Sequence, residues 1–403
     1  MPPRTVLSMI LLIFSFIVFF IGATEFMLSP MLKPLADEFR TTTDKATWLV
    51  SGYALAYALA APIFGWLSDR INRRKLLRAS LLFLFLDGVA LTIAPNLEIA
   101  IGLRIFGGIA SAALIPTIFA LVAELFPSHK QASAMGIVML GMTAGIAGGP
   151  IFAGVLTELF YWQVPFLVSA VGCFLLYVLS KKALNKKYIP NQITTLKKVH
   201  QTVTFQSLFQ FVCQGNLIRP LIAKGFWNGT AVSAFILAGE VLRHHYAMGT
   251  GAVGISVSVF GIGLGLGNLS VSIVNHLNIR DECALLLAIV LLFITSSVFM
   301  LFPLSLLFSL VCLMLWGYAL GLAAPISTSI LANRAKQDKG QILAISESLN
   351  NLTILFLLPV ATLSLTQYGT AVTTMLLGSC FIVAIGLTLK DLFVLWLRSF
   401  FLN

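Results

Sequence analysis

Long apolar segments alternate along the whole chain with short breaks that carry charged residues, proline or glycine. Each segment is close to the ~20 residues that an α-helix needs to cross a ~30 Å hydrocarbon layer. The pattern therefore predicts twelve membrane-spanning helices. They are expected at residues 6–31, 46–67, 76–94, 97–124, 132–158, 164–180, 217–242, 253–274, 283–301, 304–332, 339–364 and 370–394.

Composition narrows the class of protein. Of 403 residues, 58% are apolar and 10% are charged, whereas a soluble domain usually carries about 25% charged residues. The first apolar segment contains Glu25 and lacks a small-residue cleavage site, so we interpret it as a spanning helix and not as a signal peptide. The chain is predicted to be an all-α polytopic membrane protein.

The formal charge of +11 is concentrated in a few segments between helices. Basic residues in short loops resist translocation and mark the cytoplasmic side. The loop at 68–78, the segment at 181–216 and the loop at 334–339 are basic, which places both termini in the cytoplasm. The basic residues are not interleaved with stacking aromatic residues, so nucleic acid is not expected as a partner. Compact loops and short tails indicate a bacterial inner (plasma) membrane.

At an offset of 209 residues, the second half of the chain repeats features of the first. Such repeats are typical of transporters built from two six-helix bundles related by an axis along the membrane normal. The predicted division is a first bundle at 1–180, a cytoplasmic linker at 181–216 and a second bundle at 217–403. The matching positions are Gly52 and Gly261, Gly108 and Gly317, Ala110 and Ala319, Pro116 and Pro325, Lys130 and Lys339, and Pro150 and Pro359.

A glycine, an aspartate and a basic cluster occupy the loop that begins at residue 65. This loop resembles the signature that joins helices 2 and 3 in the major facilitator superfamily. The resemblance implies a latch that holds one conformation, formed by Gly65, Asp69, Arg70, Arg73 and Arg74. The aspartate is expected to accept hydrogen bonds at a helix N-terminus, where the macrodipole favours an anion.

Asn72 departs from the family pattern, which usually has glycine at this position. Asparagine is the residue next most tolerant of the left-handed conformation, so the departure changes the motif little. The equivalent loop of the second half, residues 275–280, has lost the acid and most of the charge. The latch is therefore predicted on one half only.

The helix expected at 132–158 is rich in small residues. It resembles the antiporter signature of the same superfamily through Gly136, Gly145, Gly149, Pro150 and Gly154. The resemblance implies that this helix seals the cavity at the interface of the two bundles and favours exchange. The alternative is a role in packing alone, because small residues let membrane helices approach closely.

Glu25 and Arg104 are the candidate proton-coupling residues. The segment 22–26, Gly-Ala-Thr-Glu-Phe, is similar to a stretch found in sugar- and drug-export members of the twelve-helix drug:proton antiporter family. Both residues lie about seven residues from the middle of their helices, roughly 10 Å toward the outside, so they share a depth. Burial favours the protonated form of a carboxyl group and a nearby cation favours the charged form. The alternative is a permanent structural ion pair.

Other polar residues inside the predicted helices mark a candidate cavity, because such groups seldom face lipid. We interpret Asp87 as a hydrogen-bonded structural acid, with a second proton site as the alternative, and Lys224 as a side chain that snorkels to the membrane surface. The cavity candidates in the second half are Trp227, Asn228, Glu347, Asn350 and Asn351.

The resemblance covers essentially the whole chain. It implies a secondary active efflux transporter, a proton-coupled antiporter that exports a drug or metabolite by alternating access. An exporter of one metabolite, such as a sugar or siderophore, and a non-transporting receptor derived from a transporter are the alternatives. The expected partners are a small-molecule substrate, protons and membrane lipids, and we expect a monomer. We expect no enzyme activity, cofactor or metal, because the chain shows no nucleophile–base pair and its five cysteines are isolated.

Overall fold

A computed structural model of the chain describes residues 4–67, 71–184, 215–276, 279–335 and 339–402. The regular secondary structure of these ranges is helical throughout. The helices that precede residue 185 are α1 (Arg4–Phe26), α2 (Leu28–Glu38), α3 (Thr43–Ala46), α4 (Trp48–Leu67), α5 (Arg73–Thr92), α6 (Leu97–Leu125), α7 (Ser128–Leu159) and α8 (Gln163–Ala183). Those that follow residue 214 are α10 (Gly215–Tyr246), α11 (Thr250–His276), α12 (Asp281–Leu301), α13 (Leu306–Arg334) and α14 (Lys339–Leu402).

Twelve of the described helical stretches account for the predicted spans. Ten are long and apolar enough to cross a membrane, and the last of these, Gly340–Val394, has 55 residues. It turns back at Gly369, whose φ of 79° and ψ of −173° belong to a region of backbone conformation that is essentially restricted to glycine. The two arms of α14 are therefore separate spans, and α5, which begins with a basic cluster, is the remaining one.

The first helix differs from its prediction. An unbroken helix was expected at 6–31, but α1 ends at Phe26 and α2 continues from Leu28 to Glu38. Pro30 explains the break, because its ring nitrogen has no proton to donate to the carbonyl of Phe26 four residues earlier. The prediction of one continuous helix is wrong, and the chain changes course next to Glu25.

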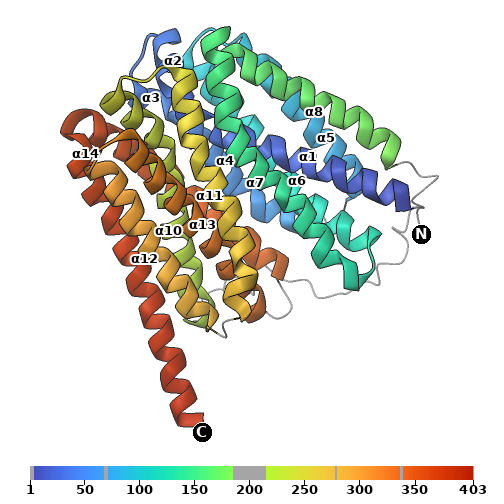
Figure 1. Cartoon of the computed structure of the whole chain (residues 1–403). Helices are drawn as coiled ribbons and strands as arrows, with labels where there is room; N and C mark the ends of the chain where they lie inside the picture. The colour runs from blue at the N-terminus through green and yellow to red at the C-terminus, as the bar shows by residue number, and fades with distance from the viewer. Residues whose placement is uncertain (1–3, 68–70, 185–214, 277–278, 336–338, 403) are drawn as a thin grey trace.

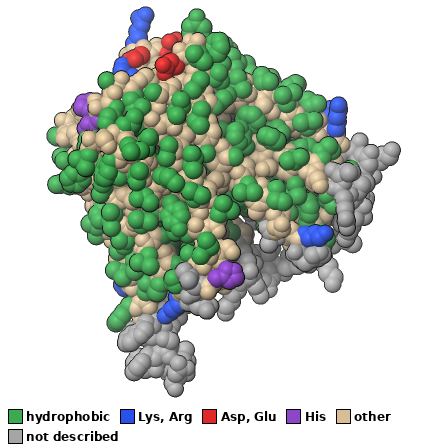
Figure 2. Space-filling model, in the orientation of Figure 1, with side chains coloured by type: hydrophobic (Ala, Val, Ile, Leu, Met, Phe, Trp, Pro, Cys, Tyr) green, Lys and Arg blue, Asp and Glu red, His purple; other side chains and the backbone are tan. Residues whose placement is uncertain are grey.

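The helices form two groups that meet along α7 and α11 (Figure 1). One group contains α1 to α8 and the other contains α10 to α14. A second contact between the groups joins α4 to the first arm of α14. We call the end at which α1 and α10 begin and α8 ends the linker side, and the opposite end the far side. The surface between the two ends is largely apolar, as expected for contact with lipid (Figure 2).

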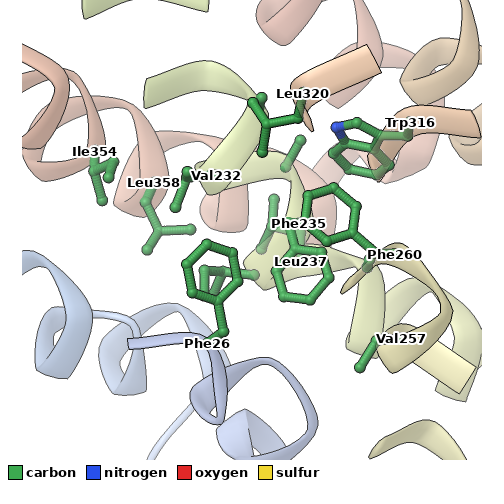
Figure 3. Packing of buried hydrophobic residues seen from close by; sticks show 14 of the residues in the cluster. Phe26, Val232, Phe235, Leu237, Val257, Phe260, Trp316, Leu320, Ile354 and Leu358 are labelled. Carbon is green, nitrogen blue, oxygen red and sulfur yellow. The ribbon is translucent and has the colours of Figure 1, made fainter. Parts of the chain in front are cut away.

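The hydrophobic cores of the two groups are joined on the far side and separate on the linker side. The joined core includes Phe26, which packs its ring 5.2 Å from that of Phe235 in α10 and 6.4 Å from that of Phe260 in α11 (Figure 3). At the linker side, one cluster is built from α1, α5, α6, α7 and α8, and another from α10, α13 and α14. The described structure is thus closed on the far side.

Candidate functional site

The predicted latch is only partly described, since Asp69 and Arg70 lie outside the described residues. Gly65 faces α14, where a Cβ added to it would lie 3.4 Å from the Cβ of Ala344. Arg73 forms an ion pair with Glu124 at the end of α6. Arg74 has a buried guanidinium nitrogen with no hydrogen-bond partner in the described structure. The loop therefore joins helix ends at the linker side, as the sequence pattern predicts for its described part.

Asn72 does not adopt the left-handed conformation. Its φ is −66°, and its side-chain oxygen accepts hydrogen bonds from the backbone N–H groups of Arg74 at 3.1 Å and Lys75 at 3.3 Å. Asn72 is therefore the N-cap of α5, a role for which asparagine is among the best residues. The asparagine at this position therefore acts through its side chain and not through a glycine-like backbone, because the cap satisfies N–H groups that have no partner inside the helix.

The glycines of α7 allow close approach of two other helices. A Cβ on Gly149 would lie 2.7 Å from the Cα of Ala23 in α1, and one on Gly145 would lie 2.9 Å from the nitrogen of Ala23. Near the far side, a Cβ on Gly154 would lie 2.9 Å from the Cα of Gly254 in α11. Gly136 has no atom within 4 Å of that position. Three of the four glycines of the predicted signature thus pack against backbone, on α1 within the first group or on α11 across the interface.

Polar contacts close the far side around the packed aromatic rings. Ser29 donates a hydrogen bond to the Phe235 carbonyl at 3.0 Å, and Arg243 donates one to the Pro30 carbonyl at 2.8 Å. Glu158, at the end of α7, accepts a hydrogen bond from the backbone N–H of Gly251 in the first turn of α11. A carboxylate at a helix N-terminus is stabilised by the macrodipole, so this contact holds the ends of α7 and α11 together.

Arg104 is buried, with 4% of its surface exposed, yet it forms no ion pair with Glu25 within 4 Å. Its guanidinium carbon lies 4.7 Å from the centroid of the Tyr53 ring in α4. One of its terminal nitrogens donates a long hydrogen bond of 3.5 Å to the carbonyl of Thr24. The structure therefore brings Arg104 to the backbone beside Glu25, but it does not join the two side chains.

Glu25 lies between the two groups of helices. It is within electrostatic range of Arg104 in its own half and of Glu347 in the second half. The next residue, Phe26, belongs to the aromatic packing that closes the far side. Glu25 thus sits directly beneath the closed end, where its charge state acts on residues of both halves.

Lys224 and Glu347 form an ion pair in the second half. This pairing was not predicted from the sequence. The Lys224 nitrogen is 3.1 Å from a Glu347 carboxylate oxygen and 3.3 Å from the Thr328 hydroxyl. The Lys224 side chain is 4% exposed and that of Glu347 is 42% exposed. The interpretation of Lys224 as a snorkelling side chain is wrong, because its ammonium group is buried against an acid.

The other cavity candidates are less accessible. Trp227 is fully buried in the joined core, and Asn350 and Asn351 are also buried. Asn351 donates a hydrogen bond to the Glu347 carbonyl at 2.9 Å, whereas the side-chain oxygen of Asn350 has no partner in the described structure. Asn228 is partly buried. Glu347 alone among the five has a side chain that is both charged and substantially exposed.

The sequence reasoning missed two tyrosines, Tyr53 and Tyr57, whose rings lie 6.1 Å apart on α4. The ring of Tyr53 packs against the guanidinium group of Arg104. Tyr57 is within electrostatic range of both Glu25 and Glu347. Their spacing of four residues places them on one helix face. Two tyrosines four residues apart in an otherwise apolar helix were the sequence signal that could have identified them as site residues.

Two membrane-embedded halves with charged residues at their interface are the arrangement of a transporter, and a family model decides which kind. The model described as Major Facilitator Superfamily matches residues 14–357. The chain belongs to this superfamily. As a member it is a multi-pass membrane protein of a superfamily of transporters.

Similar proteins come from several bacteria. The uncharacterized MFS-type transporter YceJ of Bacillus subtilis is 35% identical over 169 residues, which cover 42% of this chain and 43% of that protein. The lincomycin resistance protein LmrB of the same species is 27% identical over 230 residues, 55% of this chain and 46% of that one. The multidrug efflux pump LfrA of Mycolicibacterium smegmatis is 31% identical over 161 residues, 40% and 32% of the two chains. The matched part is less than half the length of each relative.

A solved structure supports the fold over the full length. The chain superposes with a TM-score of 0.69 on a bacterial homologue of the human lysosomal transporter Spinster, described as inward-facing and unoccupied. The match covers 96% of both chains at 16% sequence identity. The chain therefore has the major facilitator fold, with twelve spanning helices in two pseudo-symmetric bundles.

Proposed function

We propose that this transporter is a proton-coupled antiporter that exports a small molecule by alternating access. The observation that carries the proposal is the position of Glu25, held beneath the closed far side and near charges of both halves but without an ion pair. Glu25 is partly buried, and an acid inside the membrane without a fixed ion-pair partner is free to take up and release a proton. This geometry favours the coupling role over the alternative of a structural ion pair.

Proton binding at Glu25 would change how the two halves attract each other. The protonated acid is neutral, which removes its repulsion of Glu347 and its attraction to Arg104. The deprotonated acid restores both interactions, which act on opposite halves. A ligand shifts a conformational equilibrium by its differential affinity for the two states, so a proton at this position acts as such a ligand. The two bundles would then pivot around a central site as in other transporters with repeated halves.

The substrate would bind on the linker-side face of the same region. Glu347, Lys224 and Tyr57 provide an acid, a cation and an aromatic ring at the interface of the two halves. The printed names of several relatives refer to multidrug efflux or lincomycin resistance, which supports an amphipathic organic compound as the substrate. Export of a single metabolite such as a sugar or siderophore is the alternative that the test must separate.

We further propose that the linker side faces the cytoplasm of a bacterial cell and that the protein works as a monomer in the inner membrane. The basic residues at that side support this orientation, since positive loops stay in the cytoplasm. Arg73, Arg78 and Arg334 all lie at linker-side helix ends.

Two experiments test the proposal. The first compares drug susceptibility and exported metabolites of cells with and without the protein, and it selects the substrate. The second uses membrane vesicles of known orientation, in which acidification of the far side should drive that substrate out of the linker-side compartment. A substrate flux that does not respond to the proton gradient would defeat the antiport mechanism, and the absence of any flux or susceptibility change would favour a receptor.

A further inference from the structure

A small, partly open cavity of about 30 Å³ is lined only by residues of the first group of helices, among them Arg104. A cavity of this size holds one or two water molecules when it has polar partners for them. Its polar lining comes from five helices: Thr24 in α1, Tyr53 in α4, Asp87 in α5, Arg104 and Ser111 in α6, and Ser169 in α8.

The cavity gathers polar groups that lack partners. Asp87 is 9% exposed, and one of its carboxyl oxygens has no hydrogen-bond partner in the described structure. The Nε of Arg104 and the hydroxyls of Tyr53 and Ser111 are also buried without a hydrogen-bond partner. The two hydroxyls are near neighbours but do not meet hydrogen-bond geometry. Buried polar groups are normally paired, so several unpaired groups around one cavity need an explanation.

Asp87 was expected to be a hydrogen-bonded structural acid, but the described structure gives its carboxyl group no hydrogen bond. The titratable side chains that face it from the neighbouring helices are Arg104 of α6, Tyr53 of α4 and Cys173 of α8. Arg104 is the cation among them, and it forms no ion pair with Asp87 within 4 Å. An unpaired charged carboxylate is costly to bury, so the Asp87 carboxyl group needs either a partner or a proton.

Arg104 thus has an acid on each side, Glu25 toward the second half and Asp87 toward the cavity, and it contacts neither. We propose that this cavity is a second proton-binding site, in which Asp87 releases its proton to become the counter-ion of Arg104 while Glu25 is protonated. The proton leaves the carboxyl oxygen through the cavity water as Glu25 takes one up, so the number of protons on the two acids is unchanged, and the resulting Asp87 carboxylate pairs with the guanidinium. This proposal rests on the proposed proton exchange at Glu25, because the two acids share one cation.

The glycine at the contact supports a movable acid. Gly107 faces Asp87, and a Cβ at that position would collide with a carboxyl oxygen and lie 3.1 Å from the carboxyl carbon. The absence of a side chain gives the Asp87 carboxyl group room beside α6.

Infrared difference spectroscopy tests the proposal on the purified full-length protein without a substrate. A protonated carboxyl group has a carbonyl stretch that disappears on deprotonation, so an acid-to-alkaline titration should remove such a band. We expect Asp87→Asn to abolish one component of the band and Glu25→Gln to abolish another. Asp391→Asn is the matched control, since Asp391 is also buried but is ion-paired with Arg334 at 2.7 Å, and it tests whether the loss of any buried aspartate changes the band in the same way.

A second measurement covers the case in which Asp87→Asn does not fold. Wild-type protein labelled with ¹³C at aspartate carboxyls should show the Asp87 component shifted in frequency. An unshifted band in the labelled protein, or an Asp87→Asn spectrum identical to wild type, would overturn the second site. A Glu25→Gln spectrum identical to wild type would instead count against the proposed proton exchange at Glu25. Arg104→Gln should change the titration of both components, because both acids lose their cation, and an unchanged titration there would contradict the shared cation.

Discussion

Arg104 lies against the face of the Tyr53 ring, with its guanidinium carbon 4.7 Å from the ring centroid. The ring stabilises the buried cation without neutralising it. The arginine is therefore held in place while remaining available to either of two acids. A direct ion pair with Glu25 would have committed the cation to one partner.

The ring of Tyr53, and not its hydroxyl, should matter for transport. Tyr53→Phe keeps the aromatic face and removes a hydroxyl that has no hydrogen-bond partner, so we expect transport close to wild type. Tyr53→Leu removes the face, and a desolvated cation–π contact contributes about 1–2 kcal/mol, so a loss of roughly tenfold is expected. Initial transport rates of the two variants, at equal amounts of protein in the membrane, give the comparison. Equal loss in both variants would show that the hydroxyl carries the effect.

The Lys224–Glu347 pair should reveal itself in a double-mutant cycle. Glu347→Gln leaves the Lys224 ammonium buried and unpaired, which destabilises the protein. A fully buried pair would cost about 3–5 kcal/mol on loss of one partner. Because the Glu347 side chain is 42% exposed, we expect Glu347→Gln to lower the free energy of unfolding by a smaller amount, about 1–2 kcal/mol. Adding Lys224→Met should restore most of the loss, as measured by thermal unfolding in detergent. A double variant as unstable as the sum of the single variants would mean that the pair has no coupling energy.

The α7 glycines should respond to alanine according to their contacts. Gly149→Ala places a methyl group against the α1 backbone, and overpacking of this kind costs about 1–3 kcal/mol. Gly136→Ala has open space, and alanine favours a helix by about 1 kcal/mol over glycine. Thermal unfolding should therefore separate the two variants in opposite directions. Similar destabilisation by both would remove the packing explanation.

If Asn72 stabilises α5 as its N-cap, other residues with a capping oxygen should replace it better than residues without one. Asn72→Ser and Asn72→Asp should keep stability close to wild type, while Asn72→Ala should lose about 1 kcal/mol, because only the first two retain a capping oxygen. Chemical or thermal unfolding of the three variants measures the difference. If aspartate and serine are as unfavourable as alanine, the side-chain hydrogen bonds do not stabilise α5.

The hydrophobic pattern was sufficient to predict the twelve spans, since the membrane leaves few alternatives for an apolar segment of that length. The break after Phe26 was present in the sequence as Pro30, but the apolar run across it concealed the signal. The small residues of α7 correctly indicated close helix packing, because a missing side chain has few other consequences in a spanning helix.

The pairing of charges was harder to predict. The position of a residue along a spanning helix fixes its depth in the membrane, and on this basis Glu25 and Arg104 were predicted to lie at the same depth. Position does not fix the rotation of each helix about its axis or the direction of a long side chain. Arg104 therefore met Tyr53 instead of Glu25. Lys224 and Glu347 lie 123 residues apart on different helices, and no local spacing connects them. Only the packing of α10 against α14 brings them together.

The proton-coupling role of Glu25 is the central claim, and transport by Glu25→Gln in sealed vesicles of known orientation tests it most directly. The compound is the one that the export comparison identifies, and its movement is followed with and without acid on the far side. We predict that acid accelerates transport by the wild type and has no effect on Glu25→Gln, because glutamine preserves the shape of the side chain but does not exchange a proton. Undiminished acid-driven transport by Glu25→Gln would contradict the account.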